Sequence, residues 1–410
     1  MQYLTNSLDY TGANLWEFIL MPFSHGPAWM LRIPALIASI GALWIAWLIM
    51  DELKFTGTQR ITAAIPMILL PGLVWQSQDA RYYAGISLLF IAAIWFAIKS
   101  KPLGLLACMG LLPYIHPTAP AYAIAALLIA WMNRMRFWTV VKVGALALVA
   151  WMPRLIQAIT ISNSNGGFWL THISLSYALE QTAQAFAVNT LNTFGAALLI
   201  GLLAYLVIQS MMQIFERRDM LIVLTACLVP TIIMLVVSII KPVYFYRPEQ
   251  PTAIALCLLI GLTLAPASNW KSKVAPILGS FLLLVMVANY NAAIRGGYID
   301  RSAAAIRDGW HDGDRIVYVS LTAALPFDIY LHDLPACLLI HGNEGASDFS
   351  MPGCTLDDIH NTWLVWPQDI STDQLVQLTN GLIPVSRSQT WQIAPVEVYY
   401  IAHLHITLPR

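Results

Sequence analysis

Long apolar runs separated by short polar stretches make up the first 294 residues. A helix needs about 20 apolar residues to cross a bilayer. The runs predict spans near residues 31–50, 61–77, 82–98, 103–113, 118–132, 138–160, 186–209, 220–240, 250–267 and 273–294. Only 11% of the residues are charged, against about 25% in a soluble domain. We therefore expect a polytopic α-helical membrane protein with about ten spans.

Two neighbouring apolar segments are short and carry prolines. Pro113 and Pro117 predict two half-length helices that meet at Tyr114–Pro117. Irregular backbone at membrane depth is tolerated only where protein or water covers it. The residues at this break are therefore expected to face the interior of the bundle.

Basic residues predict the orientation of the spans. Alternate loops carry Lys54, Arg60, Lys99, Lys101, Arg134, Arg136, Lys142, Arg217, Arg218, Lys271 and Lys273. The positive-inside rule makes these loops cytoplasmic. The N-terminal segment 1–30, the Asp79–Arg81 stretch, His116, the loops 161–185 and 241–249 and the chain after residue 295 then share the extracytoplasmic face of the inner membrane. The formal net charge of zero says nothing about nucleic acid; for a polytopic membrane protein we expect no nucleic-acid partner.

The chain changes character after residue 294, so we expect a transmembrane domain at 31–294 and a soluble extracytoplasmic domain at 295–410. Helices alternate with apolar strands there, which is typical of an α/β domain. The expected helices are Ile299–Trp310 and Asp373–Leu382, and the expected strands are Arg315–Ser320, Thr362–Trp366 and Val396–Ile401. Outside the cytoplasm Cys337 could pair with Cys354. Asp312–Asp314 has the form of an Asp-X-Asp metal motif, but a turn before a strand explains it better.

The most informative polar stretch is Gln76–Tyr83, which lies between two apolar runs. Asp79 and Arg81 are costly to place near lipid unless they are paired, hydrated or used. Arg81 could bind a phosphate through its planar fork, with Asp79 orienting it or a metal. The alternative is a salt bridge at a helix end, with Tyr82 and Tyr83 in the interfacial aromatic belt.

Two further clusters lie on the same predicted face. His116 is a candidate metal ligand, acid–base group or hydrogen-bond anchor for the broken helix pair. The segment 241–249 is basic and aromatic, and Lys241, Tyr246 and Arg247 could hold a phosphate or diphosphate. Interfacial anchoring by snorkelling side chains is the alternative. Near the start of the chain, Asp9 and Glu17 are the only acids before Asp51.

The order of these motifs resembles the GT-C glycosyltransferases of the protein-mannosyltransferase and aminoarabinose-transferase type. The similar stretches are Leu31–Leu36, Ser77–Ala84, His116, Tyr246–Pro251, Gly313–Val319 and Leu325–Leu331. The resemblance implies a membrane enzyme that transfers a sugar from a polyprenyl-phosphate carrier to a glycan, lipid or protein acceptor, with inversion. Arg81, Lys241, Tyr246 and Arg247 would bind the carrier phosphate, and no nucleotide cofactor is expected.

The chain departs from the family pattern at its start. Neither the first span nor the acidic motif that usually supplies the general base is recognisable in the sequence. Asp9 or Glu17 would have to take that role, with Asp79 as a third candidate catalytic residue. His116 would line the cavity or bind a divalent metal. The rival hypothesis is a catalytically degenerate relative that acts as a lipid-binding membrane subunit or a transporter.

Overall fold

The computed structural model describes most of the apolar part of the chain and pieces of the rest. Two compact units separate between Asn289 and Tyr290, close to the predicted domain boundary at 294/295, which stays a prediction. The described residues are 15–23, 29–79, 81–116, 118–164, 174–188, 190–213, 217–240, 244, 249–264, 270–294, 299–318, 327, 331, 333–338, 361–367, 391–392 and 399–405.

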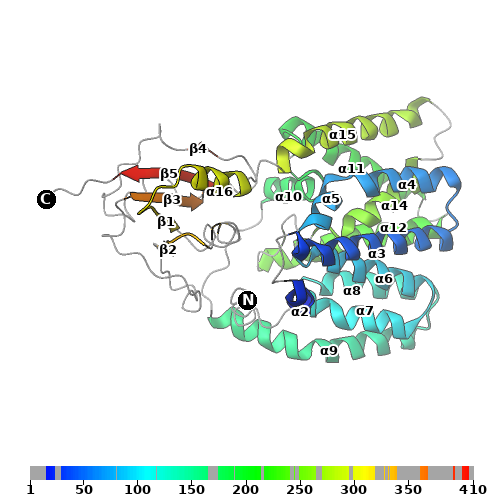
Figure 1. Cartoon of the computed structure of the whole chain (residues 1–410). Coiled ribbons are helices and arrows are strands. Elements are labelled where there is room, and N and C mark those ends of the chain that lie inside the picture. Colours follow the sequence, from blue (N-terminus) through cyan, green and yellow to red (C-terminus); the bar gives the residue numbers. More distant parts are fainter. Residues whose placement is uncertain are drawn as a thin grey trace. The chain divides into compact units, whose positions relative to one another are not determined.

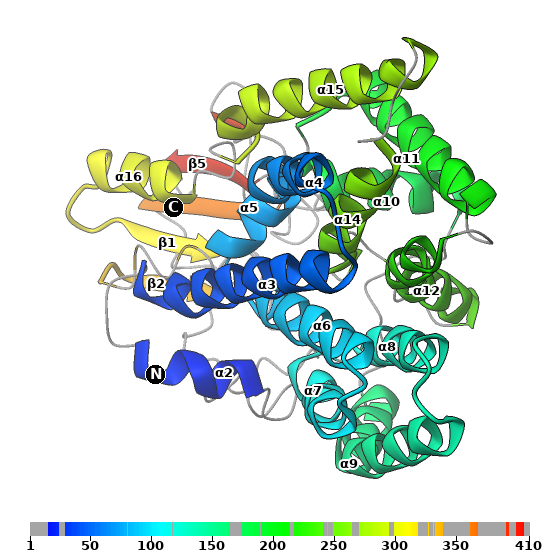
Figure 2. The same cartoon turned by 90° about the vertical axis from the view of Figure 1, so that its right-hand side faces the viewer.

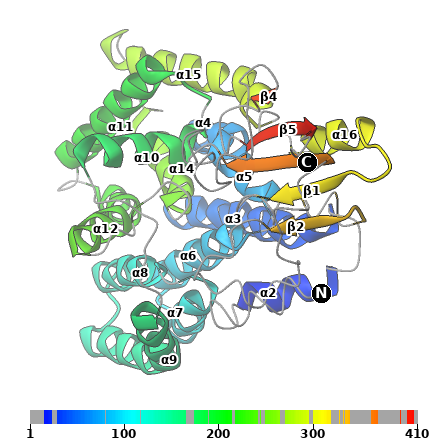
Figure 3. The same cartoon turned by 90° about the vertical axis from the view of Figure 1, so that its left-hand side faces the viewer.

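The first unit is helical throughout the part of it that the structure describes. Its elements are α2 (Leu15–Leu20), η1 (Met21–Phe23), η2 (Met30–Arg32), α3 (Ile33–Glu52), α4 (Gly57–Leu69), α5 (Pro71–Gln78), α6 (Tyr83–Ile98), α7 (Pro102–Ile115), α8 (Pro120–Met132), α9 (Phe137–Ser164), α10 (Leu175–Ala187), α11 (Thr193–Gln213), α12 (Arg218–Ile240), α14 (Thr252–Leu264) and α15 (Trp270–Ile294). In Figure 1, Figure 2 and Figure 3, α15 and α9 lie at opposite edges of this unit, with α3, α6 and α14 between them.

Nine of the ten predicted spans overlap one helix or the pair α4–α5. The span predicted over 186–209 begins at the end of α10, and α11 starts only at Thr193. Among the residues that the structure describes, four helices are long and apolar enough to cross a membrane, namely Met30–Glu52, Phe137–Ile156, Thr193–Gln213 and Arg218–Ile240. The pair α4–α5 qualifies as one broken span, and five shorter apolar helices accompany them: Tyr83–Ile98, Pro102–Ile115, Pro120–Met132, Thr252–Leu264 and Pro276–Tyr290. The number of spans stays a prediction.

The span predicted over 61–77 is a pair of helices, α4 and α5, with a bend of 52° between them. Leu70, between α4 and α5, has an extended backbone with φ −64° and ψ 120°. The cause is local: Pro71 disfavours helical geometry at the residue before it. The predicted break after α7 is present as well, since α7 ends at Ile115 and α8 begins at Pro120.

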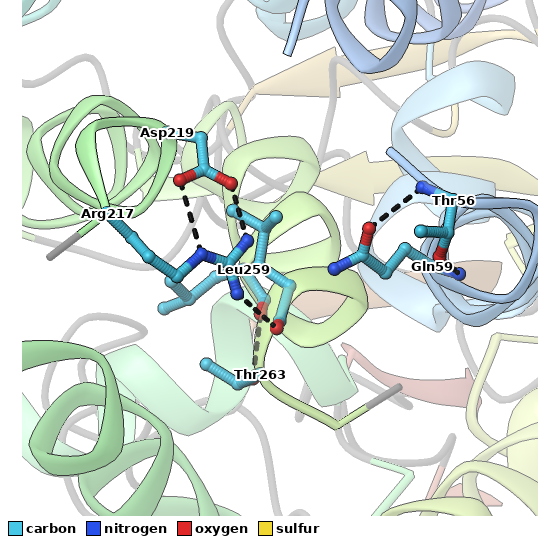
Figure 4. Close-up of polar contacts among 7 residues, drawn as sticks. Thr56, Gln59, Arg217, Asp219, Leu259 and Thr263 are labelled. Carbon is cyan, nitrogen blue, oxygen red and sulfur yellow. Dashed lines mark hydrogen bonds and ion pairs between the residues drawn. The ribbon is translucent and has the colours of Figure 1, made fainter. Parts of the chain in front are cut away.

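The loops that carry most of the basic residues meet at one end of the bundle. Lys99 Nζ lies 2.7 Å from Glu52 Oε1, and Asn133 donates to the carbonyl of Ile98. Figure 4 shows Arg217 facing the carboxylate of Asp219, 2.5 Å away. Arg217 Nη1 also donates to the carbonyl of Leu262. Nearby, Thr56 and Gln59 cap α4 reciprocally. These basic loops, which the charge pattern assigns to one side of the membrane, therefore lie close together in the structure.

The second unit contains a mixed sheet with the strand order β2-β1-β3-β5-β4. The strands are β1 (Arg315–Tyr318), β2 (Ala336–Leu338), β3 (Asn361–Pro367), β4 (Trp391–Gln392) and β5 (Tyr399–His405). β1 pairs in parallel with β2 and β3, whereas β5 is antiparallel to β3 and β4. The helix α16 (Ile299–Asp308) packs on β1 through Ala303 and Ile306, and Figure 1 shows it beside the strands.

Most of the predicted C-terminal elements appear, with shifted ends. The strand expected at Val396–Ile401 is displaced to Tyr399–His405, where its side chains match the register of β3. The helix expected at Asp373–Leu382 lies outside the described residues. Cys337 is disulfide-bonded, and its predicted partner Cys354 lies outside the described residues.

The turn before β1 is structural rather than metal-binding in form. Asp314 is 3% exposed, and its Oδ2 accepts hydrogen bonds from the His311 backbone N–H at 3.0 Å and from Trp363 Nε1 at 3.1 Å. One carboxylate therefore ties the turn to β3. This supports the interpretation of Asp312–Asp314 as a turn.

Replacing Asp314 by Ala is expected to destabilise the second unit by about 1–3 kcal/mol, because the hydrogen bonds from the His311 backbone and from Trp363 lose their buried charged acceptor. Asp312→Ala, at an exposed position of the same turn, serves as the control. Hydrogen exchange of peptides from β1 and β3 in the full chain would measure both variants. Equal protection in the two variants would contradict the assignment.

Candidate functional site

The Asp79–Arg81 stretch forms a tight connection between α5 and α6. α5 ends at Gln78, and Asp79 follows with an extended backbone. The Asp79 Oδ1 atom accepts a hydrogen bond from the Arg81 backbone N–H at 3.2 Å, which is a turn typical of aspartate. This also places the carboxylate next to the start of α6, where the helix dipole favours negative charge. Asp79 thus orders the backbone that presents Arg81, whose side chain is exposed.

The tyrosines after Arg81 turn into the bundle. The rings of Tyr82 and His116 lie with their centroids 4.6 Å apart, and the two tyrosine hydroxyls are 3.3 Å from each other. Tyr83 is 2% exposed, so it does not belong to an interfacial aromatic belt. The stretch that follows Arg81 and the break at His116, which the sequence assigned only to the same face of the membrane, are therefore in contact.

His116 closes the end of α7. Its backbone is extended, with φ −156° and ψ 143°, as expected for a residue before proline. Its Nδ1 accepts a hydrogen bond from the Thr118 backbone N–H at 3.2 Å and lies 2.7 Å from the Thr118 hydroxyl. Of the roles predicted for His116, the structure contains the hydrogen-bond anchor. The other roles stay predictions.

Arg154 is a buried cation that the sequence analysis missed. It follows Pro153 within α9 and is 7% exposed. It belongs to α9, which is hydrogen-bonded to α7, the helix that His116 follows. A charge inside an apolar run was the available signal, because such residues face the bundle interior and mark functional sites.

The short helix α2 reaches the same end of the bundle. Trp16 is buried, and it lies so close to Gly85 of α6 that a methyl group there would be 2.7 Å from the indole. The same methyl group would be 3.4 Å from Ile115, next to His116. The backbone of Glu17 is thereby placed near the His116 break. Asp9, Lys241, Tyr246 and Arg247 lie outside the described residues.

A buried carboxyl group lies just before α14. Glu249 is 2% exposed, and its Oε1 accepts hydrogen bonds from the hydroxyls of Thr231 and Thr252. Its Oε2 and both side-chain polar atoms of the neighbouring Gln250 make no hydrogen bond with the described residues. The sequence analysis did not single out this pair, although an acid at the start of an apolar span is a recognisable signal.

An apolar groove of about 130 Å³ is lined in part by α5, the helix that precedes the Asp79–Arg81 connection. Residues of α3, α4, α5, α6 and α14 line it, and the exposed Leu36, Ile40 and Ile68 form its outer edge. Gln76 and Ser77 line its polar side. The groove therefore connects an apolar outer surface with the residues that precede Arg81.

The described residues contain no group of three His, Cys, Asp or Glu side chains that could hold a metal ion. In the part of the chain that is described, His116 contacts aromatic rings and a threonine rather than carboxylates or thiols. The predicted divalent metal thus has no assigned ligand set.

Comparison with known proteins adds one finding to this geometry. No protein-family model and no curated protein matches the sequence. The crystal structure of ArnT from Cupriavidus metallidurans bound to undecaprenyl phosphate is similar in fold, with a TM-score of 0.53 and 12% identity. The similarity covers 99% of this chain and 90% of ArnT. The fold is ArnT-like.

This similarity confirms the expectation of a GT-C-like fold and of a multi-pass membrane protein. At 12% identity it applies to the fold alone. Activity belongs to the site and has to be argued from its residues.

Proposed function

We propose that this protein is a membrane glycosyltransferase that moves a sugar from a polyprenyl-phosphate carrier to an acceptor on the extracytoplasmic face, with inversion at the anomeric carbon. The observation that carries the proposal is the ArnT-like fold over nearly the whole chain, because the ArnT structure contains undecaprenyl phosphate. The glycan, lipid or protein nature of the acceptor is left to experiment.

Arg81 would bind the phosphate of the carrier. Its guanidinium is exposed at the Asp79 turn, and a planar fork suits two phosphate oxygens at once. Negative charge grows on this phosphate as the sugar leaves, so a fixed cation lowers the barrier. Lys241, Tyr246 and Arg247 would complete the phosphate site.

The apolar groove would hold part of the isoprenoid chain. Its outer edge consists of exposed aliphatic side chains, and its polar side lies at Gln76 and Ser77, a few residues before Arg81. The apolar tail of a carrier lipid would lie along the aliphatic edge, and its phosphate would lie toward the polar side near Arg81. Burial of isoprene carbons would add about 0.8 kcal/mol per methylene group.

In the proposed transfer an acceptor hydroxyl attacks the anomeric carbon opposite the phosphate. The new carbon–oxygen bond forms while the bond to the phosphate oxygen breaks, and the bonding electrons leave with the phosphate. The hydroxyl proton passes to a carboxylate acting as general base. Glu17, on the helix that packs beside the His116 break, and Asp9 are the candidate bases. Asp79 would position Arg81.

The test is transfer by the purified full chain in proteoliposomes supplied with a panel of radiolabelled undecaprenyl-phosphate sugars and envelope extracts as acceptors. We expect the radiolabelled sugar to move to an acceptor fraction. Whichever of Glu17→Gln and Asp9→Asn removes the general base should reduce this transfer by about a hundredfold. Glu52→Gln, at the opposite end of the bundle, is the control. Binding of undecaprenyl phosphate without any transfer would support the degenerate lipid-binding protein instead.

A further inference from the structure

Two buried polar side chains at the start of α14 have no role in the transfer proposed above. Glu249 is 2% exposed and Gln250 is fully buried. Glu249 Oε1 accepts hydrogen bonds from the hydroxyls of Thr231 and Thr252. Its Oε2 and both polar atoms of the Gln250 amide make no hydrogen bond with the described residues. Buried polar groups are rarely left in this state, so the pair marks a place for a ligand or for water.

The first turn of α14 places Gln250 beside the apolar groove. The Ala253 backbone N–H donates to the Gln250 carbonyl at 2.9 Å, so the helical turn includes Gln250. Ile254 follows Gln250 by four residues and lines the groove together with Gln76 and Ser77. Residues four apart lie on one face of a helix. Gln250 is therefore on the side of α14 that faces the groove.

The hydrogen-bonding capacity of the pair selects a class of ligand. Glu249 Oε2 and Gln250 Oε1 are acceptors, and the Gln250 amide nitrogen offers two donors. An anion would be repelled by the Glu249 carboxylate, and a bare cation would leave the amide donors without an acceptor. A hydroxyl group both donates and accepts. A sugar ring presents several hydroxyls in different directions, so it can satisfy both neighbouring side chains.

We propose that Glu249 and Gln250 form a buried subsite that binds hydroxyl groups of the transferred sugar and thereby selects it. This inference rests on the proposed function, in which Arg81 and Arg247 bind the carrier phosphate. Arg247 precedes Glu249 by two residues in the sequence, and the sugar is attached to that phosphate. A site built to hydrogen-bond a substrate hydroxyl discriminates strongly against a ligand that lacks it.

Matched variants separate sugar recognition from a structural role. Gln250→Met keeps a side chain of similar length but removes the donors and the acceptor. Because the amide lacks a partner among the described residues, we expect the melting temperature of Gln250→Met to stay equal or to rise. Glu249→Gln keeps an acceptor for Thr231 but places a donor where Oε2 accepts. Thr263→Val, at the other end of α14, is the control, since the Thr263 hydroxyl donates to carbonyls of its own helix.

The experiment measures binding of four lipids to the full chain in detergent: undecaprenyl phosphate and the undecaprenyl phosphates that carry glucose, mannose or arabinose. We expect the wild type to bind one sugar-bearing lipid more tightly than the others. Gln250→Met and Glu249→Gln should each weaken this binding about tenfold, and Thr263→Val should leave it unchanged. Binding of undecaprenyl phosphate should stay within about threefold of the wild type in all three variants.

Monodeoxy forms of the preferred sugar locate the hydroxyl that the subsite binds. Removing that hydroxyl should weaken binding to the wild type about tenfold but should not weaken binding to Gln250→Met further, because the two changes remove the same contact. If Glu249→Gln fails to fold, this comparison still decides. Equal losses in the wild type and in Gln250→Met for every deoxy form would overturn the contact.

The remaining outcomes separate the subsite from the proposed function. Wild-type affinity for the sugar-bearing lipids in both Gln250→Met and Glu249→Gln overturns the subsite and leaves water as its occupant. A lower melting temperature of Gln250→Met contradicts it as well, since the amide would then have a partner within the chain. An equal loss of affinity for undecaprenyl phosphate would refute recognition of the sugar. Failure of the wild type to bind any of the four lipids contradicts the proposed function itself.

Discussion

Arg81→Ala is expected to lower carrier-dependent sugar transfer by about a hundredfold or more, with little change in thermal stability. The side chain is exposed, so its removal leaves no cavity. It would stabilise the charge that grows on the leaving phosphate, and loss of one such donor typically costs two to three orders of magnitude in rate. Steady-state transfer in proteoliposomes would measure the effect.

The matched variants make this result specific. Arg81→Lys keeps the charge but loses the planar fork, so we expect an intermediate rate. Arg134→Ala, an exposed arginine at the opposite end of the bundle, should transfer sugar at the wild-type rate. Full activity of Arg81→Ala would contradict the role of Arg81 and would leave Lys241, Tyr246 and Arg247 as the only proposed phosphate ligands.

Gly72→Ala is expected to destabilise the helical unit by about 1–3 kcal/mol or more. A methyl group at this position of α5 would lie 2.2 Å from the carbonyl oxygen of Ala185 in α10. A backbone atom in a helix cannot rotate aside as a side chain can, so one of the helices has to move. Thermal unfolding in detergent would measure the loss of stability.

Gly201→Ala is the control for this prediction. A methyl group on Gly201 of α11 meets no atom within 4 Å, and alanine favours a helix over glycine by about 0.5–1 kcal/mol. We therefore expect Gly201→Ala to be neutral or slightly stabilising. Equal melting temperatures of Gly72→Ala and Gly201→Ala would show that α5 does not pack against α10 at Gly72. Because α5 leads into the Asp79 turn, Gly72→Ala should also reduce sugar transfer.

Much of the helical unit could be predicted because hydropathy is a local property. Within a bilayer, each apolar segment has to satisfy its own backbone N–H and C=O groups, and a helix does this whatever the neighbouring segments are. The break at Tyr114–Pro117 followed from prolines alone. The grouping of basic loops at one end followed from alternation of the spans, and the Lys99–Glu52 ion pair is a direct contact within that group.

The candidate site was predicted only in part, for a physical reason. Asp79, Arg81 and His116 were recognised because polar residues stand out in apolar runs. Their surroundings were not, since the burial of Arg154 depends on how α9 packs in the bundle. The hydrogen bond from Thr231 of α12 to Glu249 likewise joins distant segments.

By itself, then, the sequence determined where the helices lie, which loops share an end and which residues are chemically conspicuous. Those properties depend on nearby residues and on the bilayer. The tertiary structure decided that the Tyr82 ring contacts His116, that Nδ1 of this histidine accepts a hydrogen bond from Thr118 and that Arg154 of α9 is buried. Such contacts join distant segments through side-chain packing, which no local pattern encodes.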